Sequence, residues 1–185
     1  IGRETLSRRT ANIAFAGFTA PKLLWMRKHE PELFARIRKV MLPKDYLNYM
    51  LTGVHCTDVS DASGMLLFDV EHKCWSPEML ELCGLTGTVH EAAHELTGLA
   101  VGTPVVGGAG DNAAAAVGTA TVGDGQCNIS LGTSGTIFIS SEHFGVDPHN
   151  ALHAFAHADG HYHLMGCMLS AASCNKWWMD DILGT

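Results

Sequence analysis

The chain has 185 residues, of which 46% are hydrophobic and 17% are charged, and its formal net charge is −7 at pH 7. The hydrophobic content is sufficient for a packed core, and the length allows one domain or parts of two. The negative charge excludes a general attraction to nucleic acid or to an anionic membrane surface, and no apolar run approaches the ~20 residues of a membrane-spanning helix.

The cysteines and the start of the chain bear on where the protein is found. Six cysteines occur without a C-x-x-C motif or a disulfide-like spacing: Cys56, Cys74, Cys83, Cys127, Cys167 and Cys174. We therefore expect reduced thiols in a cytoplasmic protein. The chain begins at Ile1 and not at methionine, and it has no signal-like segment, so we expect it to be a piece of a longer protein.

Two short helices are predicted near the start. Thr19, followed closely by a proline, is typical of a capped helix start, and the sequence His29-Glu30-Pro31 is typical of a helix end. A second helix is expected from Pro31 onward. The residues expected to form its buried stripe are Leu33, Phe34 and Ile37.

A short strand and a third helix follow. Residues 40–42 favour a strand, and Pro43 favours the start of a helix that ends at Thr52-Gly53. One side of this helix is apolar and is expected to contribute to the core. Its residues are Tyr46, Leu47, Met50 and Leu51.

Small polar residues are frequent between residues 56 and 69. Asp58 and Asp61 are candidate metal ligands, but capping of a helix or turn is the favoured interpretation. Further along, Ser76 is predicted to cap a helix that Gly84 ends.

Residues 103–136 contain the strongest chemical signal. Residues 104–106 have strand character, the glycine-rich residues 107–110 allow a tight turn, and an alanine run after Asp111 and Asn112 favours a helix. Asp111 is therefore predicted at a helix N-terminus, where the helix dipole and free N–H groups keep a carboxylate ionised. Such a carboxylate can take a proton from a substrate hydroxyl, a role worth roughly 10²–10⁴-fold in rate. An ordinary helix cap is the alternative interpretation.

A second unit follows about twenty residues later. Residues 128–137 predict a β-hairpin whose turn is the sequence Gly132-Thr133-Ser134-Gly135. This turn offers N–H and O–H donors with little steric bulk, which suits phosphate oxygens. A base and a phosphate loop together allow phosphoryl transfer to an alcohol. A glycine-rich turn that binds nothing is the alternative.

The same stretch has a competing interpretation. Residues 108–113 fit G-x-G-x-x-A between a strand and a helix, which is the fingerprint of dinucleotide binding. However, Asp111 directly after the second glycine would repel a pyrophosphate. No Asp or Glu ends the next strand, at residues 129–131, where the ribose would need one. A dinucleotide-dependent oxidoreductase therefore ranks second.

Histidines are concentrated between residues 152 and 164. On a helix, His153 and His157 would have the i, i+4 spacing of zinc ligands. The alternation of apolar and polar residues around Ala158-Asp159-Gly160 favours a hairpin instead, and a metal site on neighbouring strands stays an alternative. The chain then predicts a strand end leading into a helix within residues 165–178, capped by Ser170 or Ser173.

Several segments, taken in order, resemble the FGGY family of carbohydrate kinases. They are GFTAPKLLWMRKH at 17–29, LPKDY at 42–46 with LTG at 51–53, TDVSDAS at 57–63, GGAGDNA at 107–113 and SLGTSG at 130–135. Within the family, the Asp111-Asn112 pair and the sequence GFTAPKLLW at residues 17–25 are most similar to the xylulokinases, whereas glycerol kinases tend to have Asp-Gln in place of the Asp-Asn pair.

The resemblance implies an α/β fold, actin-like and ribonuclease-H-like, of a two-domain sugar kinase that is only partly present. Residues 1–122 would be the later part of the N-terminal, sugar-binding domain, and residues 123–185 the start of the C-terminal, nucleotide-binding domain. ATP and Mg²⁺ would occupy the cleft between them, with a sugar as the other partner, and closure of the domains would exclude water. No nucleic-acid or membrane partner is implied, and a homodimer is left open.

The resemblance also implies roles for single residues. Asp111 matches the catalytic base, which takes the proton of the attacking sugar hydroxyl, and Asn112 would lie beside the sugar. The second phosphate loop is matched by Gly132, Thr133, Ser134 and Gly135. Thr133 would be the most direct phosphate contact, and no residue is assigned to a metal.

The chain also departs from the family pattern. The first phosphate loop of the Asp-x-Gly-Thr type, the Met-His pair against the sugar and the later adenosine site have no match, and the segment 85–89 is shorter than the pattern. We expect the full-length protein to phosphorylate D-xylulose to D-xylulose 5-phosphate, and these residues alone not to do so. The alternatives are a kinase for another ketose or polyol, such as ribulose or glycerol, the oxidoreductase, and a non-catalytic sugar-binding module.

Overall fold

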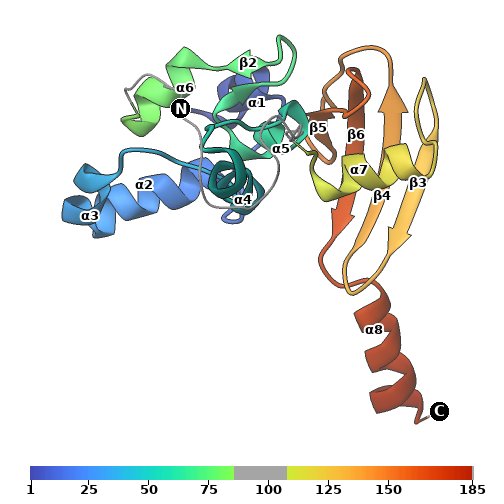
Figure 1. The fold of residues 1–185 in the computed structure, drawn as a ribbon. Coiled ribbons are helices and arrows are strands. Elements are labelled where there is room, and N and C mark those ends of the chain that lie inside the picture. Colours follow the sequence, from blue (N-terminus) through green and yellow to red (C-terminus); the bar gives the residue numbers. More distant parts are fainter. Residues whose placement is uncertain (86–107, 185) are drawn as a thin grey trace.

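The computed structural model describes residues 1–85 and 108–184. Residues 1–85 form a helical lobe, and residues 108–184 form a sheet lobe beside it (Figure 1). The helical lobe contains α1 (Arg3–Thr10), α2 (Thr19–His29), α3 (Pro31–Arg36), α4 (Pro43–Thr52), α5 (Val59–Ala62), the 3₁₀ turn η1 (Ser63–Met65), β1 (Phe68–Asp69), β2 (Cys74–Trp75) and α6 (Pro77–Cys83). The sheet lobe contains α7 (Asp111–Gly118), β3 (Cys127–Leu131), β4 (Gly135–Ser141), β5 (His153–Ala156), β6 (Tyr162–Met168), α8 (Ala172–Trp177) and the π-helix η2 (Trp178–Leu183).

Helix ends follow the local signals in the sequence. Gly53 and Gly84 end α4 and α6 in the left-handed conformation that glycine adopts without a steric penalty. The Ser76 side chain accepts a hydrogen bond from the N–H of Met79 at 3.4 Å, so the predicted cap of α6 is confirmed. The predicted cap of α2 is wrong, because Thr19 is the first helical residue and Phe18 occupies the N-cap position.

Burial departs from the sequence-based prediction at two helices. Leu33 of α3 is 45% exposed, and only Phe34 and Ile37 of the predicted stripe pack against the core. The apolar side of α4 is exposed as well, since Leu47 retains 63% of its surface and none of the described elements covers it. Residues 40–42 are irregular and not a strand. The core of the helical lobe instead centres on Leu23, Met65, Leu66, Leu67, Met79 and Cys83.

The sheet lobe is built from two antiparallel hairpins. Its strand order is β3-β4-β6-β5. Leu131 pairs with Gly135 across the first hairpin and Ala156 with Tyr162 across the second, so both predicted hairpins are confirmed. The predicted helix after residue 165 is confirmed as α8, but Ala171, which has no capping side chain, precedes it in place of Ser170 or Ser173.

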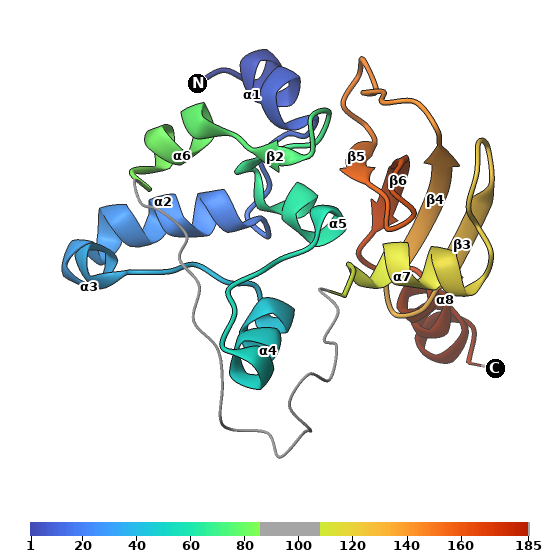
Figure 2. The ribbon, with the colours of Figure 1, turned by 45° about the horizontal axis from the view of Figure 1, so that its top comes forward.

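The two lobes contact each other along β5 (Figure 2). The Asn12 side chain donates to the Ala154 carbonyl at 2.7 Å and accepts from its N–H at 3.2 Å. The N–H of Ala156 donates to the Ser63 hydroxyl at 3.0 Å. A small apolar cluster of Ala11, Ala62, Phe68, Val70 and Ala154 includes residues of both lobes. The helical lobe thereby holds the edge strand of the sheet.

Two further sequence-based expectations are located by the fold. The predicted domain boundary at residues 122 and 123 falls in the segment between α7 and β3, and it stays a prediction. The strand expected at residues 104–106 and the short segment near residues 85–89 lie wholly or mainly outside the described residues. Among the helices that the structure describes, none is long and apolar enough to cross a membrane.

Candidate active site

Asp111 is the first residue of α7, as predicted, but it is not the helix cap. Gly110 occupies the N-cap position. The Oδ1 atom of Asp111 accepts hydrogen bonds from the backbone N–H of Asn112 at 2.8 Å and from its side-chain amide at 3.0 Å. The carboxylate is exposed. Asn112 therefore orients Asp111 through one oxygen, and the other oxygen faces no donor within the described residues.

The glycines before α7 allow it to approach the helical lobe closely. The N–H of Gly110 donates to the Ser60 hydroxyl at 2.9 Å. Gly108 has a φ of +78°, and a Cβ atom there would lie 3.0 Å from the Cδ atom of Lys44. A larger residue at Gly108 would be strained by this φ and would displace the Lys44 side chain, whereas a Cβ atom at Gly110 would lie 3.4 Å from the Asp61 carboxylate, close to ordinary contact.

Beneath this turn, one ammonium group is surrounded by carboxylates. The Nζ atom of Lys44 lies 2.7 Å from Asp45, 2.7 Å from Asp58 and 3.7 Å from Asp61. Burial alone would lower the pKa of Lys44, but its hydrogen bonds to Asp45 and Asp58 outweigh this effect and raise the pKa. Burial and the like charges of other carboxylates, Asp111 among them, raise the pKa of Asp61, although Lys44 opposes the shift.

Asp58 is a helix cap in this arrangement. Its side chain accepts from the N–H groups of Ser60 and Asp61, so the favoured interpretation of capping is confirmed. Burial would raise the pKa of Asp58, yet the hydrogen bonds from Lys44 and Ser60 lower it. A chain of contacts therefore leads from Lys44 through Asp58 and the Ser60 hydroxyl to the N–H of Gly110, next to Asp111.

A pocket of about 120 Å³ opens between the lobes at the start of α7. Residues of α5 and η1 line it from the helical lobe, and residues at the start of α7 and on β5 and β6 line it from the sheet lobe. Its lining comprises Ser60, Asp61, Gly64, Gly110, Asp111, Asn112, Ala113, Phe155, His163 and Met165. Asp111 and Asn112 therefore share one cavity, as a base and a neighbouring substrate contact would require.

The predicted phosphate loop forms the turn between β3 and β4. Gly132, Thr133 and Ser134 are exposed, whereas Gly135 is buried as the first residue of β4. The Thr133 carbonyl accepts from the Ala171 N–H at 2.8 Å and from the Ser173 hydroxyl at 3.0 Å. The start of α8 therefore holds the loop from one side and leaves the Gly132-Thr133-Ser134 turn open to solvent.

One hydrogen bond joins the two predicted halves of the site. Thr136 follows the loop directly, and its hydroxyl donates to the Oδ1 atom of Asn112 at 2.9 Å. Asn112 in turn donates to Asp111. The structure thus brings the loop-bearing strand and the helix of Asp111 together, while the chemical roles of these residues stay predictions.

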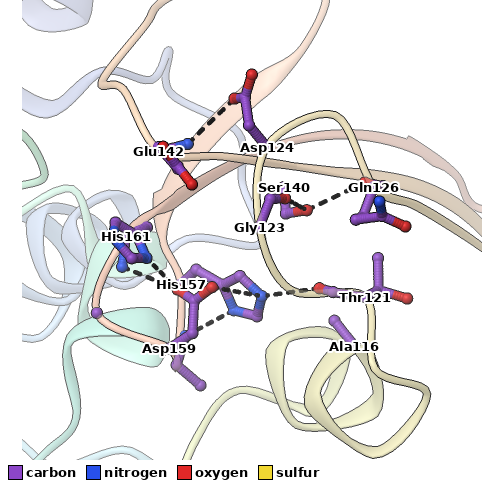
Figure 3. A network of polar contacts seen from close by, with 12 residues as sticks. Ala116, Thr121, Gly123, Asp124, Gln126, Ser140, Glu142, His157, Asp159 and His161 are labelled. Atoms are coloured by element: carbon purple, nitrogen blue, oxygen red, sulfur yellow. Dashed lines mark hydrogen bonds and ion pairs between the residues drawn. The ribbon is translucent and has the colours of Figure 1, made fainter.

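The histidines of the 152–164 segment have different surroundings: His157 is buried in a structural hydrogen-bond network, and His163 lines the pocket. His157 is fully buried, and its Nδ1 atom accepts from the Ala158 N–H at 2.7 Å. Its Nε2 atom therefore carries the proton and donates to the Thr121 carbonyl at 3.2 Å (Figure 3). The Ser140 hydroxyl binds the carbonyls of Gly123 and Gln126, so the connection from α7 to β3 is attached to the sheet.

Within residues 1–85 and 108–184, no group of three or more His, Cys, Asp or Glu side chains could hold a metal ion.

The pocket contains one residue that sequence reasoning had not connected with Asp111. His163 on β6 is 4% exposed and stacks on Phe138, with ring centroids 4.0 Å apart. Its Nδ1 atom has no hydrogen-bond partner among the described residues. The alternation along β6 could have placed His163 and Met165 on one face, but the meeting of that face with α7 depends on the tertiary fold.

Comparisons with known proteins agree on one family. A family model described as the FGGY family of carbohydrate kinases, N-terminal domain, matches residues 1–118. The chain is 46% identical over 183 residues to the xylulose kinase of Escherichia coli strain K12, covering 91% of this chain and 38% of that protein. The crystal structure of a xyloylose kinase from Brucella ovis matches with a TM-score of 0.87 at 43% identity, over 98% of this chain and 39% of the other. That of the xylulose kinase from Rhodospirillum rubrum also gives 0.87, at 27% identity, over 99% and 40%. The chain thus spans about two fifths of the length of these relatives.

Proposed function

Because this chain belongs to the FGGY family of carbohydrate kinases, we propose that the full-length protein transfers the γ-phosphoryl group of ATP to a hydroxyl of D-xylulose, giving D-xylulose 5-phosphate. The observation that carries the proposal is the shared pocket of Asp111 and Asn112 beside the strand that follows the glycine-rich turn. Xylulose kinases among the relatives and solved structures support the choice of sugar. A dinucleotide-dependent oxidoreductase is not retained, since the family is one of kinases.

In this proposal, Asp111 is the general base. Its Oδ1 atom is engaged by Asn112, so Oδ2 is the oxygen that accepts the proton of the attacking hydroxyl. The Thr136 hydroxyl holds Asn112, which limits rotation of the Asp111 carboxylate. Positioning of this kind converts a chance encounter into a reaction within one complex.

The exposed turn is the proposed phosphate-binding element for ATP. Gly132, Thr133 and Ser134 are exposed, and their small side chains leave the backbone of the turn accessible to phosphate oxygens. The Gly132 N–H and the Ser134 hydroxyl donate to the carbonyls of Ser134 and Leu169, so Thr133 is the residue that the proposal assigns to direct phosphate contact. Mg²⁺ would accompany the nucleotide and neutralise phosphate charge. We assign no residue of this chain to the ion. A sugar and ATP are the partners that the proposal requires, and a homodimer and a cytoplasmic location stay predictions.

The test is ATP consumption by the full-length protein with D-xylulose, D-ribulose, L-ribulose and glycerol. We expect turnover with D-xylulose, and Asp111→Asn should lower kcat by roughly 10²–10⁴-fold because it removes the base. Asp180→Asn, in the exposed η2 segment, is the matched control and should leave kcat unchanged. Turnover with another sugar only would reassign the substrate. No ATP consumption with any of them would leave a sugar-binding module, and turnover by the 185 residues alone would contradict their expected incompleteness.

A further inference from the structure

His163 is a buried polar side chain without a partner at the wall of the candidate sugar pocket. It is 4% exposed, and the pocket that it lines also contains Asp61, Asp111 and Asn112. Its Nδ1 atom is unpaired among the described residues. An unpaired buried polar atom costs about 1–3 kcal/mol relative to a paired one, so such atoms are uncommon unless something binds them.

The side chains around His163 hold its ring in place but give its Nδ1 atom no hydrogen bond. Phe138 stacks on it at a centroid distance of 4.0 Å, and Phe155 and His157 have ring centroids 5.3 Å and 5.7 Å away. His157 already uses both nitrogens on backbone groups, so it offers no partner to His163. The ring is therefore held in one orientation by contacts that supply no hydrogen bond to Nδ1.

The ring is also electrically neutral at physiological pH. Burial is the main cause that lowers the pKa of His163, to about 3. A neutral imidazole has one donor and one acceptor nitrogen, which matches a hydroxyl group that can both accept and donate. A protonated ring in the same pocket would instead attract the Asp111 carboxylate and lower its basicity.

We propose that His163 is a substrate-binding residue of the sugar kinase, which forms a hydrogen bond from the sheet side of the pocket to a hydroxyl of the sugar that Asp111 and Asn112 hold from the α7 side. The proposal rests on the proposed function and deepens it. It assigns to the sugar polar contacts from two elements, α7 and β6, in a pocket whose lining also includes the apolar side chains of Phe155 and Met165. A ligand without a hydroxyl at that position would leave the imidazole unpaired and would be disfavoured.

The test is equilibrium sugar binding by calorimetry, together with steady-state kinetics, on the full-length protein. His163→Phe keeps an aromatic ring against Phe138 but removes both nitrogens. We expect the Kd and KM for the sugar to rise roughly 10-fold or more, because one buried hydrogen bond is lost. The KM for ATP should be unchanged. His163→Asn, which keeps a donor and an acceptor on a shorter side chain, should recover part of the affinity. His161→Phe is the control, because this exposed histidine belongs to the same hairpin and lies outside the pocket lining.

The outcomes separate this proposal from the proposed function. Sugar affinity that is unchanged in both His163 variants, in an enzyme that phosphorylates the sugar, overturns the role of His163 and leaves the kinase assignment intact. If the wild-type protein neither binds nor phosphorylates any sugar of the panel, the proposed function and this inference fall together. If His163→Phe does not fold, the affinity of His163→Asn relative to wild type decides, and a loss greater than that of His161→Phe supports the proposal.

Discussion

Gly135→Ala should destabilise the protein through a clash at the base of the candidate phosphate loop. A Cβ atom at Gly135 would lie 2.8 Å from the Cβ atom of Ala171, closer than two carbon atoms approach without displacement. Ala171 cannot move away easily, because its N–H donates to the Thr133 carbonyl and the next N–H donates to Gly132. Overpacking of this kind costs about 1–3 kcal/mol. At about 2–4 °C per kcal/mol for a domain of this size, the thermal midpoint should fall by roughly 2–12 °C.

Gly132→Ala is the matched comparison within the same turn. Its Cβ atom would meet only the Ser134 carbonyl oxygen at 3.6 Å, an ordinary contact. We expect a change within about 0.5 kcal/mol in stability, as for most surface substitutions. However, the methyl group would project from an exposed turn, so the KM for ATP should rise about 10-fold if the backbone approaches the phosphates closely. Thermal unfolding and ATP kinetics of both variants check this pair. A Gly135→Ala midpoint equal to wild type, or a larger loss for Gly132→Ala, would refute the reasoning.

Two further predictions concern buried charge. Lys44→Met removes the ammonium between Asp45, Asp58 and Asp61. Because the Lys44 side chain is partly exposed, the change should cost about 1–3 kcal/mol in a urea denaturation, whereas the exposed Lys28→Met should cost little; equal midpoints would contradict the network. The pKa of His163 is lowered to about 3 in the folded protein, whereas in the unfolded chain it should lie near 6.5. As the pH falls below about 6.5, the unfolded chain therefore takes up a proton at His163 that the folded protein does not, and wild-type stability should decrease. His163→Phe cannot bind this proton, so its stability relative to wild type should increase by about 1.4 kcal/mol in total as the pH falls from 7.5 to 5.5. His157 and Asp159 remain in both proteins, so an unchanged difference would mean that His163 titrates normally.

Much of the local structure could be predicted because its causes are local. Gly53 and Gly84 end helices through their own backbone freedom, and the Gly132-Thr133-Ser134 turn follows from a glycine and two small hydroxyl residues between two strands. Asp111 was placed at a helix start for the same reason. The assignment of Thr19 as a cap was wrong by a single position, which is the scale on which helix boundaries are uncertain.

The remaining features depend on which elements meet in space. The apolar side of α4 indicates burial, yet Leu47 is exposed, since periodicity does not say what covers a helix face. The pocket position of His163 requires the β4–β6 register, the packing of α7 on the sheet and the contact of β5 with η1. The contacts of Lys44 likewise require three carboxylates, which lie 1, 14 and 17 residues after it in the sequence. None of these contacts can be recognised from a short motif.

The distribution of charge indicates how the candidate site would separate the two proposed substrates. Around the start of α7, the carboxylates of Asp45, Asp58, Asp61 and Asp111 outnumber the single ammonium of Lys44. Such a surrounding favours hydroxyl donors from a sugar, but it repels phosphate. The turn at residues 132–134 carries no charged side chain and presents backbone to solvent. The Thr136–Asn112 hydrogen bond joins these two environments. The acidic side is therefore suited to the neutral sugar and the turn to the nucleotide, and the attacking hydroxyl would meet the γ-phosphate where the two adjoin.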